Sequence, residues 1–386
     1  MRIALMISAF GAGGSERAMS VLANYWADNG EQVTLITLAL AGNDFYRLHS
    51  KVRRIGLGVT ARSTNLFERV WNNVERVRAL RRQIRDIRPE IVISFGDTTN
   101  VTTILAAVGM TLPVVICEQV DPRQYAIGTA WSLLRRAVYR RAVALVVVSK
   151  AMATGWAQNI VPNDRIRVIP NPVHFMPTGS ERPSNVAVRG HTIVAMGRLV
   201  KQKGFDILLE AFRLCSDRHP QWSLHILGEG DERETLEALA ETLELQGRVK
   251  FLGLVKDPSL VLRDAGMFVM SSRFEGFPLA LIEAMACGLP VISTDCPTGP
   301  SEIIRNGVDG VLVPAEDACA LSAAMECLLA DPEERHRLAT EAVNIVDRFG
   351  VEKVMMLWDQ LRMQVVGIPQ SLDRDNESIV LPGHGL

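Results

Sequence analysis

The sequence lacks an apolar run long enough to cross a membrane, which needs about 18 to 20 consecutive apolar residues. The N-terminal run RIALMISAF (2–10) is too short for a signal-peptide core followed by a cleavage site, and it fits a first buried strand better. From these absences we expect a cytoplasmic protein that is at most peripheral on the inner face of the cytoplasmic membrane.

Metal-ligand and redox spacings are also missing. The six cysteines contain no CxxC pair, and most stand in apolar runs, which is typical of reduced, buried thiols. The one D-x-D, Asp373-Arg374-Asp375, stands in the polar tail, where we expect solvated side chains. We therefore expect no metal site and no cofactor.

Net charge is only −1, but the charges are unevenly distributed. Basic residues gather in the first half, above all in the predicted helix 65–89 and in WSLLRRAVYRRA (131–142), which has four arginines and no acid. Trp71 and Phe67 accompany the arginines of the helix. A basic face mixed with apolar side chains favours an anionic membrane surface as partner, rather than nucleic acid. A soluble arginine-rich helix that packs by its apolar side remains the alternative.

Short apolar runs alternate with helical patterns along the whole chain, which is typical of doubly wound α/β domains. We predict strands at 2–10, 32–40, 89–95, 113–119, 144–149, 191–197, 222–228, 249–253, 267–272, 290–295 and 310–314. We predict helices at 15–30, 65–89, 204–218, 231–245, 257–264, 279–287, 300–305, 317–330, 333–348 and 351–366. The proline-rich stretch 168–190 separates the two alternations. The predicted domains are therefore 1–170 and 175–348, with a final helix 351–366 and a flexible tail 367–386.

Two glycine-containing loops follow predicted strands. GRLVKQKG (197–204) places Arg198 and Lys203 at a strand end, where two fixed cations and a helix N-terminus suit a diphosphate. An ordinary solvated loop is the alternative. FGAGGSER (10–17) lets the backbone approach a ligand closely, but its spacing is not that of a dinucleotide-binding G-x-G-x-x-G.

The stretch EGFPLALIE (275–283) has a glutamate at each end. Glu275 stands on the loop after a buried strand, and Glu283 about one turn into the next helix. Main-chain N–H groups at the start of that helix suit a sugar hydroxyl or a phosphate oxygen. Two carboxylates at this spacing suit a polyol that spans them, rather than an acid–base pair.

In combination, GGSER, GRL…KG, EGFPLALIE and GPSEIIRNGVDGVLV (299–313) resemble the GT4 family of retaining glycosyltransferases over residues 1 to about 365. This resemblance implies the GT-B fold: two facing Rossmann-like, doubly wound α/β domains, with the C-terminal helix returning to the N-terminal domain. It implies a metal-independent, retaining transfer of a sugar from a nucleoside-diphosphate sugar to a glycan or polyprenyl-linked saccharide acceptor. A UDP-sugar is the expected donor, because uracil is the commoner base in the family.

The resemblance also implies roles for individual residues. Arg198 and Lys203 would hold the diphosphate, Glu275 the donor sugar, and Glu283 the ribose. The other expected donor-side residues are Gly13, Gly14, Gly228, Phe251, Leu252, Gly276, Phe277, Pro278 and Leu279.

The chain departs from the family pattern on the acceptor side, because the segment 114–125 has no histidine. Glu118 or Asp121 is expected there instead, as an orienting carboxylate or as a structural one. Two other functions stay open: a UDP-sugar 2-epimerase of the same fold, and a catalytically inactive nucleotide-sugar-binding module.

Overall fold

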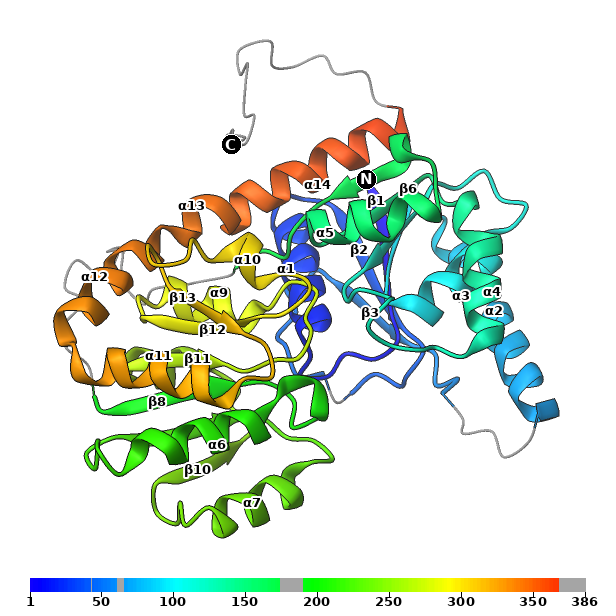
Figure 1. Ribbon diagram of the computed structural model, residues 1–386. Helices are drawn as coiled ribbons and strands as arrows, with labels where there is room; N and C mark the ends of the chain where they lie inside the picture. The colour runs from blue at the N-terminus through cyan, green and yellow to red at the C-terminus, as the bar shows by residue number, and fades with distance from the viewer. Residues whose placement is uncertain (43, 61–65, 174–189, 368–386) are drawn as a thin grey trace, which may run out of the picture.

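Two parallel sheets lie side by side in the computed structural model, which describes residues 1–42, 44–60, 66–173 and 190–367 (Figure 1). Most of the predicted linker, 174–189, and the predicted tail 368–386 lie outside the described residues. Each sheet has helices on both faces, which confirms the predicted α/β class and its two doubly wound halves.

The first sheet has the order β3-β2-β1-β4-β5-β6-β7 within the described residues, with all neighbouring strands parallel. Its strands are β1 (Arg2–Ile7), β2 (Gln32–Thr37), β3 (Arg53–Gly56), β4 (Ile91–Phe95), β5 (Val114–Glu118), β6 (Ala144–Val147) and β7 (Ile166–Val168). The strands β4, β5 and β6 are buried along their whole length, as parallel strands covered on both faces must be. The short strands β3 and β7 were not predicted.

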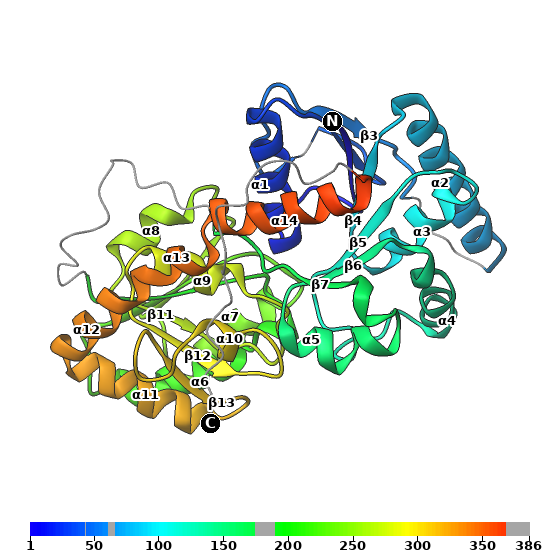
Figure 2. The same ribbon diagram turned by 90° about the horizontal axis from the view of Figure 1, so that it is seen from above.

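Helices cover both faces of this sheet. They are α1 (Gly14–Asp28), α2 (Leu66–Ile87), α3 (Asp97–Ala107), α4 (Thr129–Val138) and α5 (Lys150–Gly155), with short 3-10 turns at Tyr139–Arg141, Ala157–Asn159 and Asn163–Arg165. Figure 2 shows α1 on one side of the strands and α2, α3 and α4 on the other. Helix α1 begins after Gly13, which has extended backbone and no side-chain cap.

The second sheet has the order β10-β9-β8-β11-β12-β13 within the described residues and is also parallel. Its strands are β8 (Thr192–Met196), β9 (Ser223–Leu227), β10 (Val249–Gly253), β11 (Met267–Met270), β12 (Val291–Asp295) and β13 (Val311–Pro314). The helical segments are η4 (Lys201–Lys203), α6 (Phe205–Ser216), α7 (Arg233–Thr242), α8 (Pro258–Asp264), α9 (Leu279–Ala286), α10 (Pro300–Ile303), α11 (Ala318–Ala330), α12 (Pro332–Ala342), η5 (Val343–Ile345), α13 (Val346–Phe349) and α14 (Val351–Val366). All of the predicted strands are present, with ends that differ by a few residues.

The last helix, α14, crosses back from the second half and packs on the first (Figure 2). Trp358 lies between two aromatic rings of the first half, edge-on to Trp26 at 6.3 Å and stacked on Phe95 at 6.1 Å. The indole N–H of Trp26 donates to Asp359 at 2.8 Å. These contacts confirm the expected return of the C-terminal helix to the N-terminal domain.

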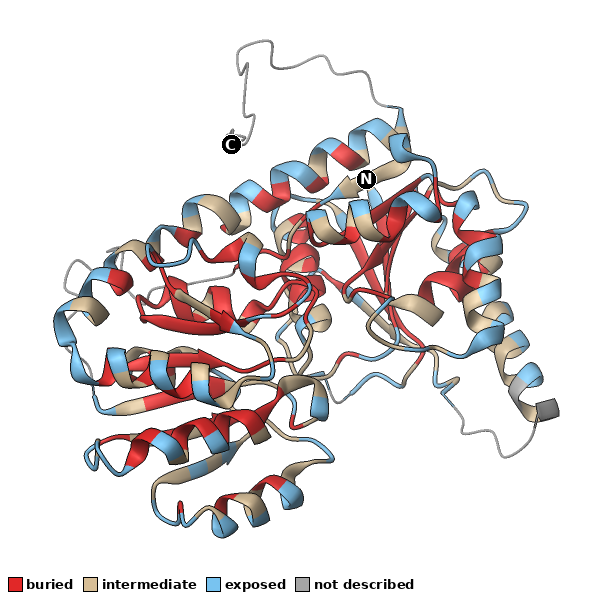
Figure 3. Ribbon diagram, viewed as in Figure 1, coloured by how far each residue is buried: buried red, intermediate tan, exposed pale blue. Residues whose placement is uncertain are grey.

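The two places where the chain passes between the halves lie next to each other. The main-chain N–H of Val173 donates to the Phe349 carbonyl at 2.8 Å, and Val173 forms a parallel bridge with Gly350. Buried residues extend from the first sheet through α9 to α14 in one continuous cluster, while a second cluster fills the outer part of the second half (Figure 3). Among the described residues, no helix is both long and apolar enough to span a membrane.

Candidate functional site

A cavity of about 800 Å³ lies between the two halves. Its walls come from the loops that follow β1, β4 and β5 of the first sheet and β8, β9, β10 and β11 of the second. Open parallel sheets bind ligands at the carboxyl ends of their strands, where the strand order reverses. Both sheets reverse here, since β1 is next to β4 and β8 is next to β11. A ligand in this cavity would therefore contact both halves.

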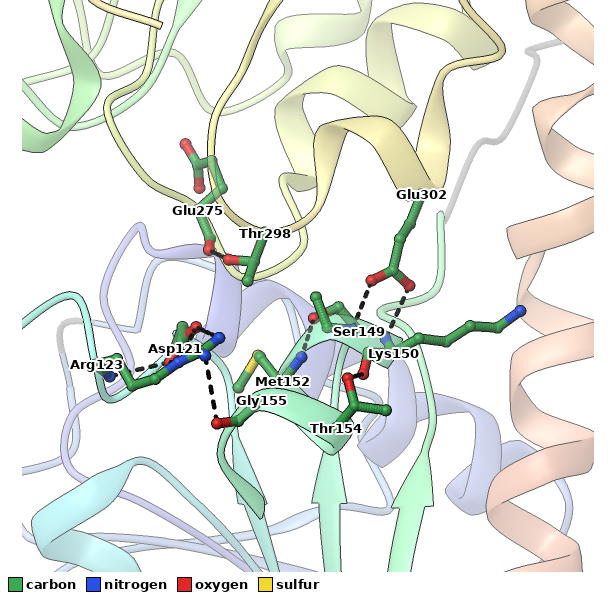
Figure 4. Close-up of polar contacts among 11 residues, drawn as sticks. Asp121, Arg123, Ser149, Lys150, Met152, Thr154, Gly155, Glu275, Thr298 and Glu302 are labelled. Carbon is green, nitrogen blue, oxygen red and sulfur yellow. Dashed lines mark hydrogen bonds and ion pairs between the residues drawn. The ribbon is translucent and has the colours of Figure 1, made fainter. Parts of the chain in front are cut away.

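Lys203, predicted to hold the diphosphate, and Glu275, predicted to bind the donor sugar, form a partly buried pair in the cavity wall. Nζ of Lys203 lies 2.5 Å from Oε1 of Glu275, and the Ser272 hydroxyl donates to the same oxygen at 2.6 Å. The main-chain carbonyl of Glu275 accepts a hydrogen bond from the hydroxyl of Thr298 (Figure 4). Because the side chain of Glu275 is only 7% exposed and is held at both ends, its position is set before any ligand arrives.

Arg198 comes from the same loop as Lys203. Unlike Lys203, it has no ion-pair partner within the described part of the chain. Gly204 ends this loop with a φ of +60°, and a Cβ there would lie 2.2 Å from the Ser271 carbonyl oxygen, so only glycine fits. Arg198 is exposed in the cavity wall, and its side chain makes no hydrogen bond or ion pair with any residue that the structure describes. Its guanidinium is therefore available to an anionic ligand.

The GFP loop, Gly276-Phe277-Pro278, touches the first half directly. A Cβ on Gly276 would lie 1.9 Å from the main-chain oxygen of Gln119, so the two backbones are in close contact. Phe277 is buried and packs edge-on against Phe349 at 5.0 Å. Pro278 caps α9, which begins at Leu279, so the free N–H groups of the first helical turn lie at the cavity.

Glu283 lies on α9 and is paired with a residue of the opposite half. Nε of Arg17, from α1, donates to Oε1 of Glu283 at 2.9 Å, and the two side chains are 25% and 12% exposed. The guanidinium of Arg17 lies over the ring of Tyr46, 5.4 Å from its centroid. Burial raises the pKa of Glu283 above its usual value, while the charge and hydrogen bond of Arg17 act in the opposite direction.

Gly13 and Gly14 line the cavity at the start of α1. A Cβ on Gly13 would lie 2.2 Å from Oε2 of Glu16, and one on Gly14 would lie 3.6 Å from Cδ1 of Leu279. Burial raises the pKa of Glu16, against the effects of its own backbone hydrogen bond and of Arg198. The glycine loop therefore faces the start of α9 across the cavity.

Gly228, Phe251 and Leu252 were all expected on the donor side, but only Gly228 lines the cavity. It has a φ of +143°, and a Cβ would lie 1.8 Å from the Gly197 carbonyl oxygen. Phe251 and Leu252 do not line the cavity: Phe251 packs against the second buried cluster, and Leu252 is 40% exposed. Their expected placement is wrong because ligands meet the loop after a parallel strand, not the strand itself. That loop contributes Leu254, Val255, Lys256 and Pro258.

Glu118 and Asp121, expected on the acceptor side, also do not line the cavity. Glu118 is 1% exposed and accepts a hydrogen bond from the hydroxyl of Tyr139, and its burial raises its pKa to about 8. Asp121 is fully buried and forms a salt bridge with Arg123 at 2.7 Å (Figure 4). The carboxylate that lines this side of the cavity is Asp97, at the start of α3.

Arg17, Tyr46 and Asp97 are among the cavity residues of the first half that were not predicted from the sequence. Asp97 had a usable signal, because it follows the predicted strand 89–95 after a single glycine. Arg17 stands in the glycine-rich motif, but nothing in its spacing points to Glu283. Among the described residues, no group of three or more His, Cys, Asp or Glu side chains is arranged to hold a metal ion.

Comparison with known families gives two matches that together span most of the chain. Residues 13–172 match the glycosyl transferase 4-like domain, and residues 180–344 match the glycosyl transferases group 1.

Similar proteins align over nearly the full length. A Campylobacter jejuni GalNAc-alpha-(1->4)-GalNAc-alpha-(1->3)-diNAcBac-PP-undecaprenol alpha-1,4-N-acetyl-D-galactosaminyltransferase is 28% identical over 95% of this chain and 99% of its own. The amylovoran biosynthesis glycosyltransferase AmsD of Erwinia amylovora is 26% identical over 91% of this chain and 96% of its own.

Solved structures share the fold. Sucrose-phosphate synthase of Thermosynechococcus elongatus superimposes with a TM-score of 0.81 at 22% identity, over 95% of this chain and all of that one. TarM of S. aureus gives 0.77 at 13% identity, over 93% and 99% of the two chains. Both halves and their order along the chain thus agree with the two family matches. The chain belongs to the group 1, GT4-like glycosyltransferases with the GT-B fold, and it is an enzyme of the hexosyltransferase type.

Proposed function

We propose that this enzyme moves a sugar from a nucleoside-diphosphate sugar, most simply a UDP-sugar, to a glycan or lipid-linked saccharide, with retention at the anomeric carbon and without a metal ion or cofactor. The observation that carries the proposal is the convergence of Arg198, Lys203, Glu275 and Glu283 on one cavity between the halves. Relatives support the substrate classes, since two C. jejuni transferases are named for undecaprenol-linked saccharides, and the HepE protein of Anabaena was solved with UDP-glucose.

The diphosphate would bind where fixed positive charge is concentrated. Arg198 offers an unpaired guanidinium, Lys203 an ammonium, and the first turn of α9 its free N–H groups. Donors held in place before the reaction stabilise negative charge on a leaving group more strongly than solvent does. These groups would take the part that a metal ion plays in other sugar-transferring enzymes.

The two glutamates would divide the rest of the donor between them. Glu275, fixed by Lys203 and Ser272, would accept hydrogen bonds from the hexose, and Glu283 would accept them from the ribose. Neither is placed as an acid–base pair, and no nucleophile is needed for a same-face displacement through an oxocarbenium-like state. Asp97, across the cavity, would accept a hydrogen bond from the acceptor hydroxyl.

The outer face of α2 would bring the enzyme to an anionic membrane. Trp71 and Val74 are exposed there, and Arg78, Arg82 and Arg85 continue the same exposed face at helical spacing. The segment 131–142 contributes less than its composition predicts, because Arg135 is buried and stacks on Trp156. The proposed surface is therefore α2, with α4 beside it (Figure 2). A bound enzyme would sit at the cytoplasmic side of the membrane that carries its acceptor.

Vesicle co-sedimentation tests the membrane surface. We expect binding at low salt to vesicles with about 30% phosphatidylglycerol and none to pure phosphatidylcholine, since each basic residue near an anionic surface contributes about 1 kcal/mol. Joint replacement of Arg78, Arg82 and Arg85 by Gln should abolish binding, while Arg213→Gln and Arg218→Gln on and just after α6 should not. Absence of binding, or equal binding by both variants, would rule out this surface.

A nucleotide screen tests the function itself. Thermal shifts with UDP-, GDP- and ADP-sugars identify the base, because a bound ligand stabilises the folded state by mass action. With the preferred donor and a lipid-linked saccharide, we expect release of nucleoside diphosphate that persists in EDTA, and a product with the donor's anomeric configuration by NMR. Arg198→Ala should lower kcat at least about 100-fold, and Arg213→Ala should not. Epimer formation would support the epimerase instead, and tight binding without turnover would support the inactive module.

A further inference from the structure

We propose that Arg17 is a positioning residue that couples closure of the two halves to donor binding, by holding one oxygen of Glu283 from the opposite half. The proposal rests on the proposed function, in which Glu283 receives the ribose. It adds a residue of the acceptor-side half to the donor site, and it makes that site complete only when the halves are closed.

The contact joins helices that are far apart in the sequence. Arg17 lies in the first turn of α1, and Glu283 lies in α9, 266 residues further along. Both side chains line the cavity, so the contact sits where the donor is expected. When the halves separate, this ion pair must break, since the two helices belong to different halves.

Only one of the two carboxylate oxygens is occupied. Nε of Arg17 donates to Oε1 at 2.9 Å, and no described residue donates to Oε2. A ribose hydroxyl can therefore bind Oε2 while Arg17 stays on Oε1. The arginine and the donor would then act on Glu283 together, and neither needs to displace the other.

The position of Arg17 is itself fixed by aromatic contacts. Its guanidinium lies over the ring of Tyr46 at 5.4 Å, a distance at which cation–π attraction is significant. Tyr46 in turn packs edge-on against Phe10 at 6.4 Å and Phe45 at 5.1 Å. These aromatic contacts all lie within the first half. They would therefore hold the Arg17 guanidinium in place before the halves close.

The charge of Arg17 should affect the affinity of the site for the donor. Glu283 is largely removed from water, which raises its pKa, and Arg17 is the basic group that acts on it in the opposite direction. A carboxylate without Arg17 would be a weaker acceptor for ribose hydroxyls, since hydrogen bonds to an ionised, oriented acceptor are the stronger ones. By linkage, a donor that binds better to the closed form must also favour closure by the same factor.

A double-mutant cycle with two nucleotides tests the inference. UDP and 2′,3′-dideoxy-UDP differ only in the ribose hydroxyls, so the difference between them reports contacts to the ribose. We expect Arg17→Ala to weaken UDP binding about tenfold, equivalent to about 1.4 kcal/mol, and to leave dideoxy-UDP binding unchanged. Glu283→Gln should do the same, and the double variant should bind UDP no more weakly than the weaker single variant.

Two controls keep the result interpretable. Arg213→Ala removes a surface arginine of α6 that pairs with Asp217, the residue that follows the last turn of the same helix. This variant should bind UDP and dideoxy-UDP as wild type does. Arg17→Lys, which retains the charge, separates loss of fold from loss of function and should recover part of the UDP affinity. Equal loss for both nucleotides, with additive effects in the double variant, would overturn the proposal and place Arg17 on the diphosphate.

Closure of the two halves can also be measured directly, without knowledge of the donor. Small-angle X-ray scattering should give a larger radius of gyration for ligand-free Arg17→Ala than for wild type. An unchanged radius would overturn the coupling. If wild type binds neither UDP, GDP nor ADP, the proposed function fails, and the scattering result still decides whether Arg17 holds the halves together.

Discussion

Glu118 is a buried carboxyl group whose pKa lies above its usual value. It is 1% exposed, one of its oxygens receives the Tyr139 hydroxyl, and the other, Oε2, has no partner among the described residues. Burial raises its pKa to about 8, Asp97 adds to the shift, and Tyr139 and Arg135 oppose it. A protonated carboxyl can donate as well as accept, so Glu118 lies close to Asp97 without adding a second negative charge.

This state predicts a pH dependence of stability. Between the usual pKa of 4.5 and about 8, the folded chain keeps a proton on Glu118 that the unfolded chain releases. Stability from this group is therefore full below pH 4.5 and falls as the pH rises to 8, by up to about 1.4 kcal/mol per pH unit. In urea unfolding from pH 5 to 9, Glu118→Gln should remove this decline. An unchanged slope in the variant would show that Glu118 is ionised in the folded protein.

At the scale of elements, the GFP loop is a point of close backbone contact between the halves. Every near neighbour of a Cβ on Gly276 belongs to Gln119 or Val120 of the opposite half. An added methyl group would therefore leave the second half intact and prevent its contact with the first.

We expect Gly276→Ala to lower kcat at least about tenfold while changing the free energy of unfolding by less than about 1 kcal/mol, because overpacking acts only across the closed interface. Steady-state kinetics and urea unfolding measure the two effects. Gly11→Ala is the matched control, since a Cβ there would meet nothing within 4 Å, and it should be silent. A large loss of stability in Gly276→Ala would show instead that the loop is packed within its own half.

Elements with a strong periodic signal were predictable from the sequence, and those set by tertiary contacts were not. The fully buried strands are continuous apolar runs. The edge strands β3, with sequence RRIG, and β7, with sequence IRV, are short and partly exposed, so their pairing comes from neighbours. Helix α3 has four threonines, which disfavour helix locally, and burial of that face overrides the propensity.

The same division applies to the site. The second half contributes Arg198, Lys203, Glu275 and Glu283 from two short motifs. Because each motif is continuous in the sequence, its residues could be predicted without knowledge of the fold. The first half contributes Arg17, Tyr46 and Asp97 from three separate segments, namely the start of α1, the loop after β2 and the start of α3, and only the sheet brings these together. Whether these residues meet Glu283 across the cavity depends on how the two halves close on each other. No spacing in the sequence encodes that arrangement.

At the scale of the whole molecule, α14 and α10 tie the halves together outside the cavity. The Glu302 carboxylate accepts hydrogen bonds from the main-chain N–H groups of Lys150 and Ala151, at 2.8 and 2.9 Å, at the start of α5 (Figure 4). The guanidinium of Arg348 donates to the carbonyls of Glu302 and Ile303, both at 2.7 Å. Glu302 thus joins α10 to the start of α5 across the two halves, and Arg348 holds α10 from within its own half.

Trp358 should be the residue of α14 on which global stability depends most. It is 2% exposed and packs on Trp26 and Phe95. We expect Trp358→Ala to lower the free energy of unfolding by about 3 to 5 kcal/mol through the cavity it leaves. Leu357→Ala, at a position 40% exposed on the same helix, should cost less than about 1 kcal/mol. Urea denaturation compares the two, and similar losses would mean that α14 is not anchored through Trp358.

The neighbouring chain crossings at Val173 and Gly350 make the second half an insert within the first half. Residues 174–349 leave and re-enter the host at two points joined by one hydrogen bond, so the host needs only a short splice to be closed without them. A module with adjacent ends can be exchanged as one cassette. Transplanting 174–349 from a relative with a different nucleotide sugar should thus change the donor while the host keeps its acceptor, a route by which such enzymes could diversify one substrate at a time.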